Sequence, residues 1–118
     1  ERVYPDRDYV ARVRKLASEN GYSIKEASVF CTDSIAMEYT HLDEIRSFDT
    51  DLIEMETSAF YAIAEMMDIP AVALLVVSDN SATGVPLVGR SEEIQRKYEH
   101  SRCQVLPDMI YRIAKMKV

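Results

Sequence analysis

Two acidic residues directly follow apolar segments in the middle of the chain, where a carboxylate can transfer protons or bind hydroxyl groups. Glu56 follows the run "DLIEM" (51–55), and Asp79 follows "AVALLVV" (71–77) and Ser78. In an open parallel sheet, ligands bind outside the carboxyl ends of the strands. If both runs are strands of one sheet, Glu56 and Asp79 therefore face a shared pocket.

Each carboxylate also has a purely structural explanation. An Asp after a strand often caps a turn or a helix, and Glu56 precedes Thr57 at the start of a predicted helix, where negative charge is favourable. The residue types alone leave both explanations open.

The elements that must position these residues are predicted from periodicity and turn residues. Seven consecutive apolar residues in 71–77 indicate a strand buried on both faces, as in parallel sheets. Alternating helices and strands predict an α/β fold, with 51–79 as a right-handed βαβ unit, in a single domain over residues 1–118. The predicted order is helix 6–20, strand in the second half of 22–31, loop 32–40, short helix opening at Thr40-x-x-Asp43, strand 51–55, helix 57–68, strand 71–77, loop 80–89 and helix 91–117, capped by Ser91 and kinked or broken at Pro107.

Composition restricts the possible partners. The formal net charge of −6 gives no basic footprint for nucleic acid. No apolar run reaches the roughly 18 residues that span a membrane, and "ERVYPDRDYV" has no signal-peptide core. Cys31 and Cys103 lack metal-ligand spacing and are interpreted as reduced thiols. We therefore expect a cytoplasmic protein without metal, membrane or nucleic acid.

The segment "IEMETSAFYAIAEMMDIPAVALLVVSD" (53–79) resembles the signature region of the nucleoside phosphorylase and nucleosidase superfamily. That superfamily includes purine nucleoside and uridine phosphorylases and the methylthioadenosine and AMP nucleosidases. Its members share a Met-Glu dyad after a strand, a small-residue helix, an apolar strand and a Ser-Asp pair. "CTDSI" (31–35) stands where the family has a Thr/Ala-Asp-x-aromatic segment. The resemblance covers about residues 5–115 and implies the C-terminal half of a three-layer α/β/α sandwich with a mixed, largely parallel sheet.

The resemblance implies two catalytic residues. Asp79, beside Ser78, would donate a proton or hydrogen bond to a purine ring nitrogen, which requires a protonated carboxyl in apolar surroundings. Arg90 would assist Asp79, although an exposed loop arginine is the alternative. Arg96 is a weaker candidate, because helical spacing puts it on a surface face. Asp79 favours a purine nucleoside over uridine.

The resemblance also implies the residues that bind the nucleoside. Glu56 would accept hydrogen bonds from the ribose hydroxyls, and Met55 would lie against the sugar. Glu54 either points to the same side as Glu56 or is solvated. Ile35 stands where many members have a base-stacking aromatic residue, so either Ile35 or Tyr39 would replace that contact.

The resulting hypothesis is cleavage of the N-glycosidic bond of a purine nucleoside, by phosphorolysis to free base and ribose 1-phosphate, with phosphate as co-substrate and no cofactor. The alternatives are hydrolysis of AMP or methylthioadenosine by a nucleosidase, and a truncated, non-catalytic nucleoside-binding domain. No glycine-rich phosphate turn is visible, because the glycines are isolated at 21, 84 and 89. We expect these residues either to be part of a larger protein or to complete the fold with a second chain that supplies the N-terminal half, and the resemblance implies a homo-oligomer.

Overall fold

The computed structural model describes residues 1–80, 83–84 and 88–117, which divide into two compact units. The first unit comprises Glu1–Arg14 and Ile24–Ala73, and the second comprises Lys15–Ser23 and Leu74–Val118. The expectation of a single domain over 1–118 stays a prediction, and each unit is described by itself.

Helix α1 (Arg7–Glu19) confirms the helix predicted over residues 6–20 and contributes residues to both units. Its start is capped by Asp6, whose Oδ1 accepts a hydrogen bond from the Tyr9 N–H at 2.7 Å. Its end is set by Gly21, which has a φ of 75° in the left-handed region that glycine tolerates. Val13 and Ala17 are buried on one face of the helix.

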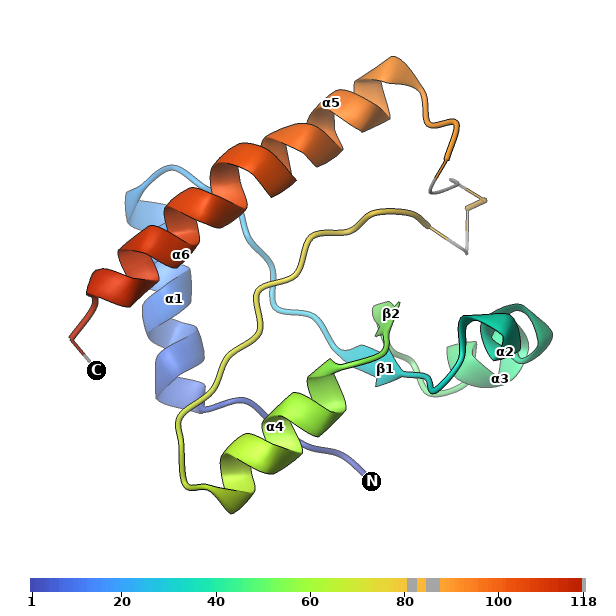
Figure 1. Ribbon diagram of the computed structural model, residues 1–118, viewed down its shortest axis with the longest axis horizontal. Coiled ribbons are helices and arrows are strands. Elements are labelled where there is room, and N and C mark those ends of the chain that lie inside the picture. Colours follow the sequence, from blue (N-terminus) through green and yellow to red (C-terminus); the bar gives the residue numbers. More distant parts are fainter. Residues whose placement is uncertain (81–82, 85–87, 118) are drawn as a thin grey trace. The chain divides into compact units, whose positions relative to one another are not determined.

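The first unit contains a two-stranded parallel sheet (Figure 1). β1 (Val29–Cys31) pairs with β2 (Leu52–Glu54) in a register that puts Cys31 opposite Glu54. The connection between them carries α2 (Ile35–Thr40) and α3 (Leu42–Arg46). The α/β class and the parallel pairing are confirmed, as are strands within 22–31 and 51–55.

The prediction of a loop over residues 32–40 is wrong, because α2 occupies its second half. This helix follows Ser34, which is extended; it has 6 residues and buries none of its side chains, and a segment this short gives little periodicity to detect. The short helix α3 is confirmed. Its predicted Thr40–Asp43 cap is wrong, since His41 takes the N-cap position without a side-chain hydrogen bond.

Helix α4 (Thr57–Met66) follows β2 after a two-residue turn and lies within the helix predicted for residues 57–68. The chain leaves it through Met67 and Asp68, which has a φ of 54°. The Ile69 N–H then bonds back to the Ala64 carbonyl at 2.9 Å, closing the helix end.

The strand predicted over residues 71–77 is wrong, and so is the second half of the predicted βαβ unit. The segment belongs to no strand of the described structure, and Leu75 and Val77 are 44% and 59% exposed. A strand buried on both faces needs neighbours that pair its N–H and C=O groups along both edges. The described residues supply isolated bonds at its start instead: Ala71 accepts from the Asp6 N–H, and Ala73 donates to the Tyr61 hydroxyl.

The second unit contains a long helical stretch made of α5 (Glu92–His100), the π-helical turn η1 (Ser101–Val105) and α6 (Leu106–Lys115), which run on as one rod (Figure 1). The predicted cap is confirmed, because Ser91 Oγ accepts from the Ile94 N–H. Pro107 does not break the stretch: it lies in the first turn of α6, directly after η1. Met109 is fully buried.

Two further predictions concern the loop at 80–89 and the absence of a membrane-spanning segment. The predicted loop 80–89 includes residues 81–82 and 85–87, which lie outside the described residues, and its described part contains a turn at 83–84. Among the helices of the described ranges, none combines the length and the apolar character that crossing a bilayer would require.

Candidate functional site

The Met55–Glu56 dyad lies in the turn between β2 and α4, and Glu54 fixes this turn. Glu54 Oε2 accepts hydrogen bonds from the backbone N–H groups of Glu56 at 2.7 Å and Thr57 at 2.8 Å, and Oε1 lies 3.0 Å from the same Thr57 nitrogen. The first N–H groups of a helix have no partner within the helix. The Glu54 carboxylate therefore caps α4 and holds the backbone of the dyad.

The Cys31 thiol, from the neighbouring strand, completes this arrangement. Its Sγ donates to Glu54 Oε1 at 2.6 Å and accepts from the Ser58 N–H at 3.1 Å. Burial and the hydrogen bond to Glu54 raise the pKa of the Cys31 thiol. Burial alone would raise the pKa of Glu54, but the bonds from Cys31, Glu56 and Thr57 outweigh it and lower that pKa. The proton therefore stays on sulfur and the carboxylate stays charged.

The Glu56 side chain is in the opposite situation. It is exposed, and no side chain or backbone group of the described residues pairs with its carboxylate. Met55 beside it is 41% exposed. An ionised carboxylate accepts hydrogen bonds only and can take two hydroxyl groups at once. Glu56 is thus available to a ligand while its backbone is fixed.

Ile35 and Tyr39 both lie on α2 in the first unit, with 64% and 69% of their surface exposed. Either side chain can present apolar or aromatic surface to a ligand. Their predicted part in base binding stays a prediction.

In the second unit, Arg90 lies beside the Ser78–Asp79 pair. Ser78 Oγ donates to Asp79 Oδ1 at 2.6 Å, and Arg90 Nε donates to the Ser78 carbonyl at 2.9 Å. Ser78 lies twelve positions before Arg90 in sequence. Arg90 is thus bonded to the backbone of the residue that precedes Asp79.

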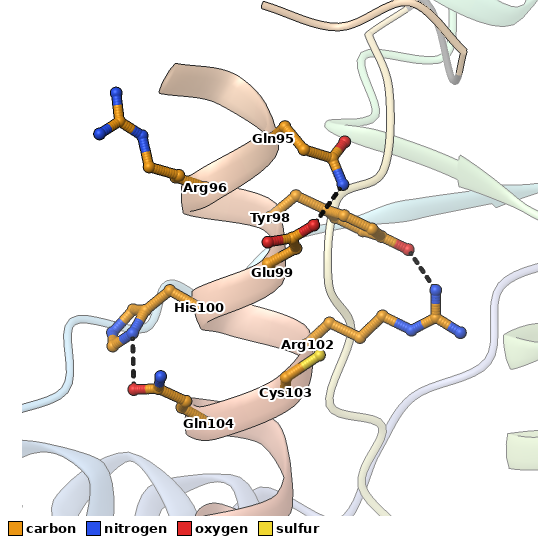
Figure 2. Close-up of a pocket in the computed structure, with 8 residues that line it drawn as sticks. All are labelled: Gln95, Arg96, Tyr98, Glu99, His100, Arg102, Cys103 and Gln104. Carbon is orange, nitrogen blue, oxygen red and sulfur yellow. Dashed lines mark hydrogen bonds between the residues drawn. The ribbon is translucent and has the colours of Figure 1, made fainter. Parts of the chain in front are cut away.

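Arg90 is held from its other side by two residues that the sequence analysis missed. Its Nη1 donates to Gln95 Oε1 at 2.9 Å, and its guanidinium carbon lies 4.1 Å from the centre of the Tyr98 ring. Gln95 in turn donates to Glu99, and the Tyr98 hydroxyl accepts from Arg102 at 3.1 Å (Figure 2). One signal in the sequence could have indicated these residues. Gln95 and Tyr98 have the i, i+3 spacing that puts two side chains on one face of a helix, and that helix begins just after Arg90, with Ser91 as its N-cap.

The hollow in Figure 2 lies along this same helical stretch. All of its lining residues fall within 95–104, so it is a surface hollow on one helix. Arg96 points to a different side of the helix from Tyr98 and is exposed, as its predicted surface position required (Figure 2). None of the principal site residues predicted from the sequence lines this hollow.

The predicted site residues therefore fall into two local groups. Glu54, Met55, Glu56 and Ile35 belong to the first unit, and Ser78, Asp79 and Arg90 belong to the second. Their convergence on one pocket stays a prediction. Within the described ranges, no group of three or more His, Cys, Asp or Glu side chains is arranged to hold a metal ion.

Comparison with known proteins gives a consistent set of similarities. Residues 1–110 match the phosphorylase superfamily. The chain is 30% identical over 77 residues to the DeoD-type purine nucleoside phosphorylase of Anoxybacillus flavithermus, covering 65% of this chain and 33% of that protein. It is 37% identical over 68 residues to the DeoD-type enzyme of Clostridium perfringens, covering 57% of this chain and 29% of that protein. The matched region thus spans about a third of the length of these curated relatives. No solved structure matches the chain.

Proposed function

This chain belongs to the phosphorylase superfamily, and on this premise we propose that it carries the base- and ribose-binding residues of an enzyme that cleaves the N-glycosidic bond of a purine nucleoside. The observation that carries the proposal is the Ser78–Asp79–Arg90 cluster, in which an arginine is anchored beside a candidate acid. The relatives named as purine nucleoside phosphorylases support a purine as the base.

Asp79 is the proposed general acid. When the glycosidic C–N bond breaks, the electron pair goes to the base, and a proton from the Asp79 carboxyl neutralises a base ring nitrogen. Asp79 is left as a carboxylate, which the Arg90 guanidinium beside it stabilises through charge. Ser78 holds one oxygen of Asp79, so the other oxygen is the proposed donor.

Glu56 is the proposed ribose-binding residue. Its carboxylate is exposed and unpaired among the described residues, and its backbone is fixed by Glu54. It would accept hydrogen bonds from the 2′- and 3′-hydroxyls, while Met55 lies against the sugar. These bonds orient the sugar for attack at its anomeric carbon.

Phosphate is the proposed nucleophile, with ribose 1-phosphate as product, because the relatives are named as phosphorylases. No glycine-rich turn for phosphate is visible in residues 1–118, so the phosphate-binding groups would come from outside these residues. Two alternatives remain: hydrolysis, in which water takes the place of phosphate, and a nucleoside-binding role without catalysis.

Calorimetric titration of the chain with adenosine, inosine and uridine, with and without phosphate, tests the proposal together with analysis of the products. We expect both purine nucleosides to bind more tightly than uridine. Binding that phosphate strengthens would mean that the assembled protein also supplies phosphate contacts. Base release without phosphate would indicate a nucleosidase, and binding without any product would indicate the non-catalytic alternative. Equal affinity for uridine and the purine nucleosides would contradict the purine assignment.

Asp79→Asn is expected to lower turnover of inosine at least about 100-fold, because the amide cannot donate the proton that the leaving base needs. The matched control is Asp68→Asn, the same chemical change at an exposed residue with a φ of 54°, a conformation that asparagine tolerates. Initial rates at saturating inosine and phosphate measure the effect. If the Asp79 variant turned over inosine as fast as the control, Asp79 would not be the general acid.

A further inference from the structure

The contact between Cys31 and Glu54 joins two strands and a helix at the point where the dyad begins. The two residues are opposite each other in the β1–β2 register. Cys31 Sγ donates to Glu54 and also accepts from the Ser58 N–H in the first turn of α4. The thiol is therefore bonded both to the residue before the dyad and to a residue just after it.

Glu54 depends on these donors for its orientation. Its carboxylate takes one thiol donor from β1 and two backbone N–H donors, from Glu56 and Thr57. A glutamate side chain has several rotatable bonds, and a free carboxylate at the end of a strand would sample many of their rotamers. The Thr57 side chain, within the turn, also hydrogen-bonds this carboxylate, whereas the thiol is a side-chain donor that comes from outside the turn.

We propose that Cys31 is a positioning residue for the Met55–Glu56 dyad: through its hydrogen bond to Glu54, it holds the turn that presents the Glu56 carboxylate to the ribose of the ligand. The part of this inference that concerns the ligand depends on the proposed function. The part that concerns the turn does not depend on it.

The protonation states are consistent with this arrangement. Burial and the neighbouring carboxylate raise the pKa of the Cys31 thiol, so it remains an S–H donor at neutral pH. A thiolate at 2.6 Å from the Glu54 carboxylate would be repelled by it. The contact therefore requires the neutral thiol.

Three variants separate positioning from simple stability. Cys31→Val is close to cysteine in size, suits a strand and cannot donate, whereas Cys31→Ser keeps a donor and an acceptor. The matched control is Cys103→Val, the same change at the other free cysteine, which is exposed on η1. Thermal unfolding of all three variants monitors their overall stability.

The first measurement is amide hydrogen exchange at Glu56, Thr57 and Ser58, followed by NMR. We expect exchange at these amides to be about tenfold faster in Cys31→Val, a factor that corresponds to losing one modest hydrogen bond, and to return toward wild type in Cys31→Ser. Cys103→Val should leave these amides unchanged. Wild-type exchange rates in Cys31→Val would overturn the inference.

The second measurement compares the dissociation constants of adenosine and free adenine. Cys31→Val should weaken adenosine about tenfold and adenine less than twofold, with Cys31→Ser close to wild type. Equal losses for both ligands would mean a general structural role and would overturn the ligand part of the inference. If the unmodified chain binds no nucleoside, the proposed function fails, and amide exchange alone decides whether Cys31 holds the turn.

Discussion

Glu54 and Glu56 are two residues apart in sequence, but the Glu54 carboxylate is hydrogen-bonded within the protein and the Glu56 carboxylate is not. Strand alternation would put both side chains on one side, but the strand ends at Glu54 and the chain turns into α4. Glu54 folds back onto the first N–H groups of the helix, and Glu56 is left exposed. One carboxylate is thus engaged in structure, and the other is open to a ligand.

Glu56→Ala should weaken adenosine by about tenfold to a hundredfold and leave free adenine unchanged, because two hydrogen bonds from ribose hydroxyls to a charged acceptor are lost. Calorimetric titration with both ligands measures the effect. Glu65→Ala, at an exposed position later in α4, is the control. If adenine and adenosine lose affinity equally, Glu56 does not bind the ribose.

Glu54→Gln should remove an acid-sensitive part of the stability. The pKa of Glu54 lies below its ordinary value of 4.5, so the carboxylate stabilises the folded state fully above that value and loses this contribution as pH falls through the folded pKa. Urea unfolding between pH 7 and pH 3 measures the slope. We expect the variant to be less stable at pH 7 and to lose less stability in acid than the wild type. Parallel curves would show that Glu54 does not titrate as described.

The sequence allowed the candidate acid and its arginine to be named, and the structure puts Arg90 beside Ser78–Asp79. It did not allow the role of Cys31 to be predicted, since that role depends on the β1–β2 register, which is a non-local property. A lone cysteine without metal-ligand spacing gives no local signal of a hydrogen bond to a residue 23 positions away.

At the scale of elements, α5 positions Arg90. Its residues Tyr98 and Gln95 contact the Arg90 guanidinium, which donates to the Ser78 carbonyl. A guanidinium over an aromatic ring is stabilised by about 0.5–2 kcal/mol, depending on solvent exposure. The helix therefore restricts the arginine to a small set of positions near the candidate acid.

Tyr98→Leu should weaken adenine and adenosine alike, by about threefold to tenfold, because Arg90 loses its aromatic support and orders Asp79 less well. Tyr111→Leu is the matched control, since the Lys115 ammonium lies 4.2 Å from the Tyr111 ring on α6. Titration with both ligands distinguishes this base-side effect from the ribose-side effect of Glu56→Ala. An unchanged affinity for adenine in the Tyr98 variant would show that Tyr98 on α5 does not affect binding of the base.

Local signals made most elements predictable. Asp6, Gly21 and Ser91 set helix ends through their own backbone or side-chain preferences, which sequence displays directly. Helix α2 was not predicted; it is short and none of its side chains is buried. The strand expected over 71–77 could not be decided locally, since an apolar run becomes a strand only where neighbouring strands accept its hydrogen bonds.

At the scale of the whole molecule, the main feature is an apolar surface along α4 and the residues just after it. We call this the α4 surface; its exposed members are Phe60, Ile63, Met66, Met67 and Ile69. Apolar side chains clustered on a surface favour association with another protein surface. The expectation of an oligomer or a second chain therefore has a specific surface on which it can be tested.

The double variant Ile63→Lys, Met66→Lys should reduce self-association, because two charges would have to be buried in any contact made by the α4 surface. Sedimentation velocity over about a hundredfold range of concentration measures the effect. Ile110→Lys, at a 55% exposed position on α6, is the control. A wild-type chain that stays monomeric throughout, or equal behaviour of both variants, would contradict this role for the α4 surface.

The π-helical turn η1 has a consequence for how the chain can vary in length. The Leu106 N–H bonds to the Ser101 carbonyl, five residues back, so this turn accommodates one residue more than an α-helical turn. Pro107 is the second residue after it, and its ring would clash in a regular α-helix with the carbonyl four residues earlier. Deleting one residue from η1 would restore the α-helix and that clash together, whereas a deletion inside α6 would rotate buried Met109 by about 100°. Among homologous sequences, the extra residue and the proline should therefore be gained or lost as a pair.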